Sequence, residues 1–327
     1  LYAAGFNAHG QLDSTTTEDV KTFQPIAGTG SAQSRVLFAG WSTTVIVVGD
    51  RIRSVGHQKI DHKLDLDADA GVLKSAIGDH DGMLGCLDEK GRLYVVEEQR
   101  LVCKSMDASP RIGYLAQACN NRIAMTAMQT PEGQVCHLTE FDTFEKFLHW
   151  YEDPSGESNY PASHHMLPGR PKSLQANVAN FLLLMERGDV WTWGDSRYQS
   201  LGRDVAGDGA VPAHRPGAVE ALGGISIKLI AAGGWQAAAL SEDGALYIWG
   251  AQTPGSEHCI KALIPSEVSL VTIPGNADDE PLDILDVGIG SGHIAVLTEG
   301  NALYVAGQNN NGQLGIGRED AFVHEWQ

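Results

Sequence analysis

Three short segments carry residue types that could do chemistry, and the first is acidic. Asp65, Asp67 and Asp69 in the segment DLDADAG have the spacing of the first ligands of a calcium loop. Such a loop needs a turn glycine at its sixth position and a bidentate glutamate at its twelfth, and these positions hold Ala70 and Ala76. We therefore interpret the segment as a solvated acidic loop and not as a calcium site.

The other two segments are a histidine pair and a glycine-rich run. His164 and His165 are adjacent, which is a poor geometry for shared metal ligation, and they have no clear Cys or carboxylate partners. Residues 288–293 read GIGSGH and resemble a phosphate-binding loop, but they lead into the strand-like HIAVLTEG and not into a helix. The motifs GxSxG and GxxxxGK[ST] are absent. We expect no catalytic residue, no metal and no cofactor, and predict that the protein is not an enzyme.

The elements that must position any site are repeats. The segments LYAAGFNAHGQLD, residues 1–13, and LYVAGQNNNGQLGIG, residues 303–317, align without a gap. Further copies begin near residues 51, 92, 134, 189 and 245. The spacing of roughly 40–57 residues lies in the range of propeller blades or long solenoid repeats.

A second phrase precedes most copies, as in LIAAGGWQAAALSEDG before ALYIWG. It consists of a short apolar strand that ends in glycine or a polar loop, an alternating strand and a tight turn. Three or four strands per unit, seven units and no long helix predict an all-β, seven-bladed propeller.

These phrases resemble the repeats of the regulator of chromosome condensation family, whose members are seven-bladed propellers. The resemblance covers essentially the whole chain and implies a single propeller domain over residues 1–327. It departs near the C-terminus: after IGRED the chain reads AFVHEWQ, where the family pattern continues with a strand, a Gly loop and another strand. In the family this missing phrase closes the ring against the N-terminal LYxxG strand, so we predict that the last blade is incomplete.

Residues 141–171 interrupt the repeat rhythm and are predicted to be an inserted helix and loop. TFEKFLHWYED has apolar residues at 144, 147, 148 and 151, an amphipathic helical pattern, and the Pro-, Ser- and Gly-rich PSGESNYPASHHMLPGRP reads as an exposed loop. The insertion either packs on a blade edge or binds a partner.

Charge and cysteine content restrict the classes of partner. Lys plus Arg number 23 against 41 Asp plus Glu, a formal net charge of -18, which disfavours direct binding to DNA. Five cysteines without a CxxC pair favour a reduced intracellular protein with buried thiols. We find no signal peptide and no apolar run long enough to span a membrane, so we expect no membrane association.

A recognition surface remains as the candidate site. One loop position recurs in every repeat, and equivalent positions in a propeller point to one face. The partner-binding candidates there are Trp41, Asp79, His80, Trp235, Gln236 and His293, with Asn120, Asn121 and Asn180 at the same position of weaker repeats. Large aromatic residues in loops are common interface anchors. Alternatively, the two tryptophans plug gaps between blades and His293 makes a structural hydrogen bond that holds its loop.

Within the family, the short propeller-only length and the immediate LYAAGFNAHGQL start resemble the fungal α-tubulin suppressor, or killer-toxin-insensitivity, type. This resemblance implies a non-catalytic adaptor for a small CSL-type zinc or iron protein in diphthamide synthesis and Elongator-dependent tRNA wobble-uridine modification. It also implies a monomer or heterodimer in the cytoplasm, or in cytoplasm and nucleus. The alternative is guanine-nucleotide exchange on a Ran-like small GTPase, as in the founding member. A ubiquitin-ligase or histone-demethylase accessory role is a third hypothesis, which no residue selects.

Overall fold

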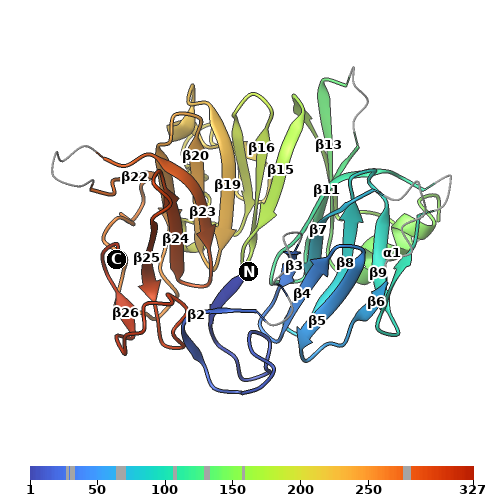
Figure 1. Cartoon of the computed structure of the whole chain (residues 1–327). Helices are drawn as coiled ribbons and strands as arrows, with labels where there is room; N and C mark the ends of the chain where they lie inside the picture. The colour runs from blue at the N-terminus through green and yellow to red at the C-terminus, as the bar shows by residue number, and fades with distance from the viewer. Residues whose placement is uncertain are drawn as a thin grey trace.

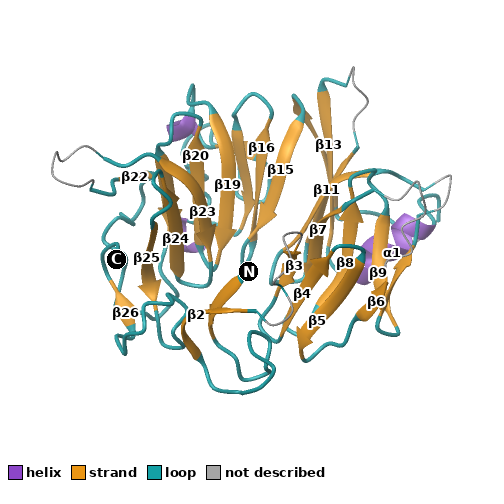
Figure 2. Ribbon diagram, in the orientation of Figure 1, coloured by secondary structure: helices purple, strands orange, loops and turns teal. Residues whose placement is uncertain are grey.

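The computed structural model describes residues 1–26, 29, 34–63, 71–105, 109–128, 133–156, 159–274 and 281–327. In these residues the chain forms six four-stranded antiparallel sheets and one two-stranded sheet, arranged as a propeller (Figures 1 and 2). The all-β propeller prediction is therefore confirmed. The acidic segment Asp65–Asp69 lies outside the described residues.

In each four-stranded sheet the strands pair in chain order. The first three sheets are β3–β6 (Ser34–Ala39, Thr43–Val48, Arg51–Gly56, Asp61–Lys63), β7–β10 (Leu73–Gly78, Met83–Asp88, Leu93–Glu97, Arg100–Cys103) and β11–β14 (Ile112–Gln117, Ile123–Ala127, Val135–Phe141, Ser163–Pro168). The next three are β15–β18 (Pro171–Ala176, Asn180–Met185, Val190–Gly194, Gly217–Ala218), β19–β22 (Ile227–Gly233, Gln236–Ser241, Leu246–Gly250, Ser269–Val271) and β23–β26 (Ile284–Ile289, His293–Thr298, Leu303–Gln308, Phe322–Val323). Two short 3-10 helices, Arg197–Gln199 and Glu220–Leu222, lie in loops.

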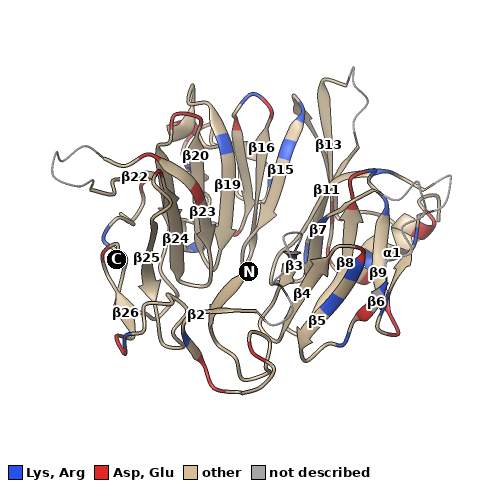
Figure 3. Cartoon of the chain, viewed as in Figure 1, with Lys and Arg blue, Asp and Glu red and all other residues tan. Residues whose placement is uncertain are grey.

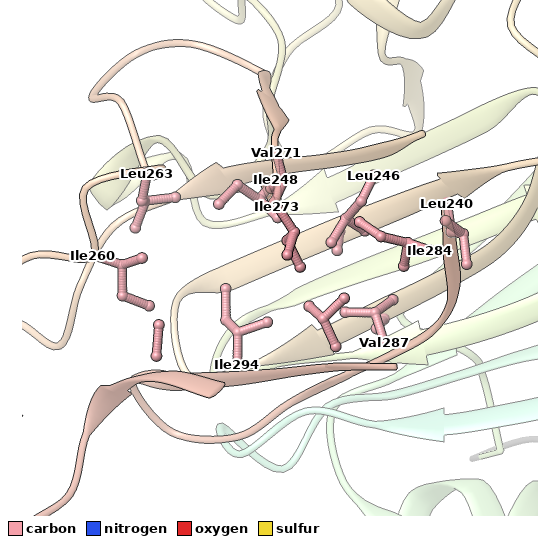
Figure 4. Packing of buried hydrophobic residues seen from close by; sticks show 14 residues of the cluster. Leu240, Leu246, Ile248, Ile260, Leu263, Val271, Ile273, Ile284, Val287 and Ile294 are labelled. Atoms are coloured by element: carbon pink, nitrogen blue, oxygen red, sulfur yellow. The ribbon is translucent and has the colours of Figure 1, made fainter. Parts of the chain in front are cut away.

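The first strands of neighbouring sheets contact one another in the order β3, β7, β11, β15, β19 and β23, so they form the inner ring of the propeller. Layers of aliphatic side chains fill the space between sheets. In Figure 4, Leu240, Leu246 and Ile248 of one sheet pack with Ile284 and Ile294 of the next. Burying each such side chain contributes about 1.5–3 kcal/mol, which explains why single sheets of this kind occur as rings.

All seven copies of the repeated phrase contribute a third strand or its equivalent: β1 (Tyr2–Gly5), β5, β9, β13, β17, β21 and β25. Where the phrase ends in glycine, that glycine has a positive φ, for example 112° at Gly56 and 103° at Gly250. A Cβ at Gly56 would collide with the carbonyl oxygen of Ser42, and one at Gly250 with that of Trp235. The glycine therefore lets the third strand press against the turn between the first two strands, and this contact fixes the turn.

The two-stranded sheet, β1 with β2 (Val20–Pro25), lies between the sheet β23–β26 and the sheet β3–β6 (Figure 1). On one side, Gly317 N donates to Lys21 O at 2.9 Å and Lys21 Nζ lies 2.6 Å from Glu319 Oε1. On the other side, Gln11 Nε2 donates to Trp41 O at 2.8 Å. The sheet thus joins the last complete sheet to the first.

The described residues form six complete blades and not seven, and the two-stranded sheet is the incomplete one, as the prediction of an incomplete last blade implied. The last repeat, β25, lies in a complete four-stranded sheet, because the terminal AFVHEWQ segment supplies β26 and Gln327 exchanges two backbone hydrogen bonds with Val305, each 3.1 Å. The short sheet holds the first repeat, β1, which is the strand that the missing C-terminal phrase was expected to join. One consequence is that Tyr2, which the repeat pattern places among the residues between blades, is 72% exposed.

Residues 141–171 contain the helix α1 (Phe144–Glu152), capped by Thr143, whose Oγ1 accepts from Lys146 N at 3.3 Å. Phe144, Phe147 and Tyr151 are buried against the sheets β7–β10 and β11–β14. The following segment is not only an exposed loop, since Ser163–Pro168 forms β14 along β13. The helix packs on the propeller, as in the first of the two interpretations of this segment.

Candidate functional site: the turn face

The predicted site residues lie in or beside the turns between the first and second strands of the sheets. We call the surface formed by residues 40–42, 79–82, 118–122, 177–179, 234–235 and 290–292 the turn face. Neighbouring turns are tied together: Ser42 Oγ donates to His80 O at 2.5 Å, and Val178 N donates to Gly234 O at 3.1 Å. The turn face is therefore one connected surface at one end of the propeller.

Trp41 is the most exposed of the predicted aromatic residues on this face, with 59% of its surface accessible. Its indole is stacked on Phe6, with ring centroids 5.2 Å apart and an interplanar angle of 10°. His9 approaches it edge-on at 5.2 Å. Trp41 thus packs on the loop that follows β1 and still offers a large apolar surface to solvent.

A pocket of 390 Å³ adjoins Trp41 and brings three of the predicted residues together. Its lining comes from the sheets β3–β6, β7–β10 and β11–β14 and consists of Phe38, Ala39, Gly40, Trp41, Gly78, Asp79, His80, Gln117, Ala118, Cys119 and Asn121. Small residues make this space possible. A Cβ at Gly40 or Gly78 would meet the ring of Phe38 at 2.5 or 2.7 Å.

Trp235 lies on the turn between β19 and β20 and is half-buried. Tyr198 packs on it at a centroid distance of 4.7 Å, and the Arg197 guanidinium lies 6.0 Å from the ring. Arg197 is itself held by Asp195, with Nε 2.8 Å from Oδ2. Trp235 therefore lies in an aromatic and cationic cluster of its own, outside the pocket beside Trp41.

Gln236 and His293 have structural surroundings. Gln236 is fully buried, and its Nε2 donates to Gln252 Oε1 at 3.1 Å, while Gln252 Nε2 donates to Gly292 O at 2.7 Å. The His293 ring lies against Gly290, where a Cβ would collide with it. Burial lowers the pKa of His293, so the ring is neutral near pH 7. Gln236 has no accessible surface for a partner.

The asparagines predicted from the weaker repeats also differ in position, since two are accessible at or beside the pocket and one is buried. Asn121, with a positive φ of 70°, lines the pocket, and Asn120 is exposed beside it. Asn180 is fully buried and donates to Ser200 Oγ. Phe6, His9 and Gln117 belong to the site but were not among the predicted residues. Phe6 and His9 lie in the loop that follows β1 in the repeated phrase, and the aromatic rings of these two loop residues were the signal that could have identified them.

The histidine pair and residues 288–293, two of the segments weighed for chemistry, form no assembled centre in the described structure. Among the described residues, no group of three or more His, Cys, Asp or Glu side chains could hold a metal ion. His164 Nδ1 and Thr139 Oγ1 share a hydrogen bond of 3.1 Å. Residues 288–293 form the end of β23 and the turn into β24.

All five cysteines are free. Cys86 and Cys136 are buried as expected, but Cys103, Cys119 and Cys259 are exposed. No helix in the described parts of the chain has the length and apolar character needed to cross a membrane.

The described charges are spread around the propeller. In Figure 3, acidic residues lie in several loops at both ends of the sheets. Two of the described carboxylates, Asp88 and Glu140, are fully buried, and Glu140 accepts from Arg122 Nη2 and Ser163 Oγ, both at 2.7 Å. Because a buried charge needs such partners, we assign Glu140 a role in holding β13 to β14 and the preceding strand.

Comparison with known proteins supports the repeat assignment. Residues 187–240 and 284–313 match models of the regulator of chromosome condensation (RCC1) repeat. RCC1 domain-containing protein 1 of Mus musculus is 30% identical over 178 residues, which are 45% of this chain and 46% of the relative. Regulator of chromosome condensation of Mus musculus is 30% identical over 141 residues, 43% of this chain and 32% of the relative. The matches thus span less than half of either relative.

Among solved structures, Prp20p from Saccharomyces cerevisiae is similar with a TM-score of 0.67, covering 100% of this chain and 84% of that chain at 15% identity. At this identity the similarity establishes a common propeller fold and nothing about partners. Together with the repeat matches, it shows that the chain is a β-propeller that carries repeats of the regulator of chromosome condensation type.

Proposed function

We propose that this propeller is a non-catalytic regulator that binds a protein partner through the turn face, around Trp41. The observation that carries the proposal is the exposed indole of Trp41, 59% accessible and stacked on Phe6 at the edge of a 390 Å³ pocket. A large aromatic side chain that is held in place by its neighbours loses little conformational entropy on binding, which is typical of interface anchors.

For the partner, we propose a small CSL-type zinc or iron protein, with a role in diphthamide synthesis and Elongator-dependent tRNA wobble-uridine modification in the cytoplasm, or in cytoplasm and nucleus. Support comes from the resemblance of the propeller and its LYAAGFNAHGQL phrase to the fungal α-tubulin suppressor type. The second candidate is nucleotide exchange on a Ran-like small GTPase. It is favoured by the similarity to Prp20p, whose structure was described with its binding properties to Gsp1p and histones.

Binding measurements with both purified candidates separate these two functions. We expect a recombinant CSL-type protein to form a 1:1 complex in calorimetry, and Trp41→Ala to weaken this complex at least about tenfold, since anchors of this kind contribute at least about 2 kcal/mol. Leu270→Ala is the matched control, because Leu270 is 57% exposed on β22, away from the turn face.

Two outcomes would contradict the proposal. Accelerated GDP release from a Ran-like GTPase, with no complex with the CSL-type protein, favours the second candidate. Equal effects of Trp41→Ala and Leu270→Ala on whichever partner binds would show that the interface lies elsewhere.

A further inference from the structure

The pocket beside Trp41 combines groups that suit a planar cation. Phe38 and Ala118 contribute apolar lining, and Trp41 contributes an aromatic wall. Phe6 is stacked against one face of the Trp41 indole, so the exposed surface of Trp41 includes the other face. Aromatic faces attract cations through the quadrupole of the ring, and tryptophan does so most strongly.

Gln117, at the end of β11, supplies an unused acceptor. Its Oε1 atom is buried, and within the described residues no donor reaches it. Gln117 also lines the pocket. Since a buried acceptor without a partner costs free energy, a ligand that donates a hydrogen bond here removes that cost when it binds.

Asp79 supplies a negative charge at the same place. Its Oδ1 accepts from Asp81 N at 2.9 Å, which orients the carboxylate and leaves further acceptor positions on it. Asp81 differs, because its side chain is 80% exposed, lies 3.6 Å from His80 Nε2 and is not part of the pocket lining. The net charge of -18 adds a long-range attraction for a basic surface.

We propose that the pocket binds an arginine side chain of the partner protein, whose guanidinium stacks on Trp41 and donates to the Asp79 carboxylate and to Gln117 Oε1. Arginine fits better than lysine because its planar group stacks on an aromatic face and directs several donors outward at once. This inference rests on the proposed function, since it names the feature of the partner that the turn face recognises.

The test uses the full chain and two short peptides, acetyl-Gly-Arg-Gly-amide and its analogue with citrulline, which has nearly the same shape but no charge. Binding is followed by NMR at the indole N–H of Trp41, which is assigned by its loss in Trp41→Phe. We expect a saturable shift with the arginine peptide and at least about fivefold weaker binding of the citrulline peptide, because the charge is removed beside a carboxylate.

Variants then locate the site. Asp79→Asn should weaken binding of the arginine peptide about fivefold, whereas Asp81→Asn, which changes the net charge equally, should change it less than about twofold. Gln117→Leu should also weaken binding, while thermal unfolding of each variant shows whether the fold is kept. Equal binding of the two peptides, or equal losses in Asp79→Asn and Asp81→Asn, would overturn the inference.

The two proposals can fail separately. If Trp41→Ala abolishes partner binding but the arginine peptide does not bind, the arginine pocket is wrong and the docking face stands. If the peptide binds as expected but no candidate partner depends on Trp41, the pocket stands and the proposed function is wrong.

Discussion

Tyr198 and Trp235 belong to neighbouring sheets, and their rings lie 4.7 Å apart at an angle of 57°. His9 and Trp41 form the same contact at 5.2 Å and 64°. His9 and Tyr198 each lie four residues after the glycine that ends a third strand, Gly5 and Gly194. The loop after the third strand of one sheet thus packs on the turn of the next sheet. The same tryptophan can fill this contact and remain accessible, so plugging and recognition are compatible roles.

We expect Trp41→Ala and Trp249→Ala to differ strongly in stability. Trp249 is fully buried and donates from Nε1 to Ser200 O at 3.2 Å, so truncation should lower the free energy of unfolding by about 3–5 kcal/mol. Trp41→Ala should cost about 1 kcal/mol, mainly the stacking on Phe6. Urea unfolding followed by circular dichroism measures both, and a loss of more than about 3 kcal/mol in Trp41→Ala would identify it as a core residue.

Where a third strand ends in glycine, that glycine should be intolerant of a side chain for a steric reason. Gly250→Ala places a Cβ against the carbonyl oxygen of Trp235, whereas a Cβ at Gly255 meets no described atom within 4 Å apart from those of its chain neighbours. Both glycines have positive φ, 103° and 83°, so the control carries a comparable backbone strain. We expect Gly250→Ala to be about 1–3 kcal/mol less stable than Gly255→Ala in urea unfolding, and equal stabilities would refute the collision.

Acid should destabilise the protein partly through His293. Burial lowers the pKa of this side chain below its ordinary value of 6.5, so the unfolded chain binds a proton at pH values where the folded protein does not. Its contribution is therefore fully present above pH 6.5 and declines as the pH falls from there toward the lower folded pKa. The free energy of unfolding of His293→Gln should change less between about pH 7.5 and 5.5 than that of the parent protein. His214→Gln, at an exposed histidine, should behave like the parent.

Thiol alkylation should distinguish the buried cysteines from the exposed ones. Burial raises the pKa of Cys86 and of Cys136 to about 12, which leaves on the order of one thiolate in ten thousand at pH 8. Iodoacetamide should modify the exposed Cys103 in the native protein and spare these two, as read by peptide mass spectrometry. After denaturation all three should react, and native labelling of Cys86 would show that its sheet opens.

The repeat pattern predicted the fold because it reports local geometry. Each copy of the phrase became a third strand, and the glycine at its end marks a close backbone contact that only glycine permits. The turn face followed from the same register, since equivalent positions of equivalent sheets point the same way. Trp41, Asp79 and His80 were brought to one pocket in this way.

The remaining features depend on contacts between segments far apart in sequence. The sequence places Gln236 on a turn, but its burial is set by Gln252 from the following loop. The role of Phe6 depends on its stacking with Trp41, a residue of the next sheet. The pairing of the terminal segment with β25 could not be predicted from the repeated phrase, because β1 carries the same phrase.

The sheet of β1 and β2 joins the two ends of the chain, so it closes a much longer loop than the junctions between sheets that are consecutive in the chain. Its loop-closure entropy differs accordingly. Lys21 and Glu319 are 298 residues apart, whereas Gln252 and Gly292, across a typical neighbouring pair, are 40 apart. Closing the longer loop costs about 1.8 kcal/mol more. We therefore expect hydrogen exchange to occur sooner at Gly317, whose amide donates to Lys21, than at Val178, whose amide donates to Gly234. A ring built from nearest-neighbour contacts should thus open first at the one place where its two ends are joined.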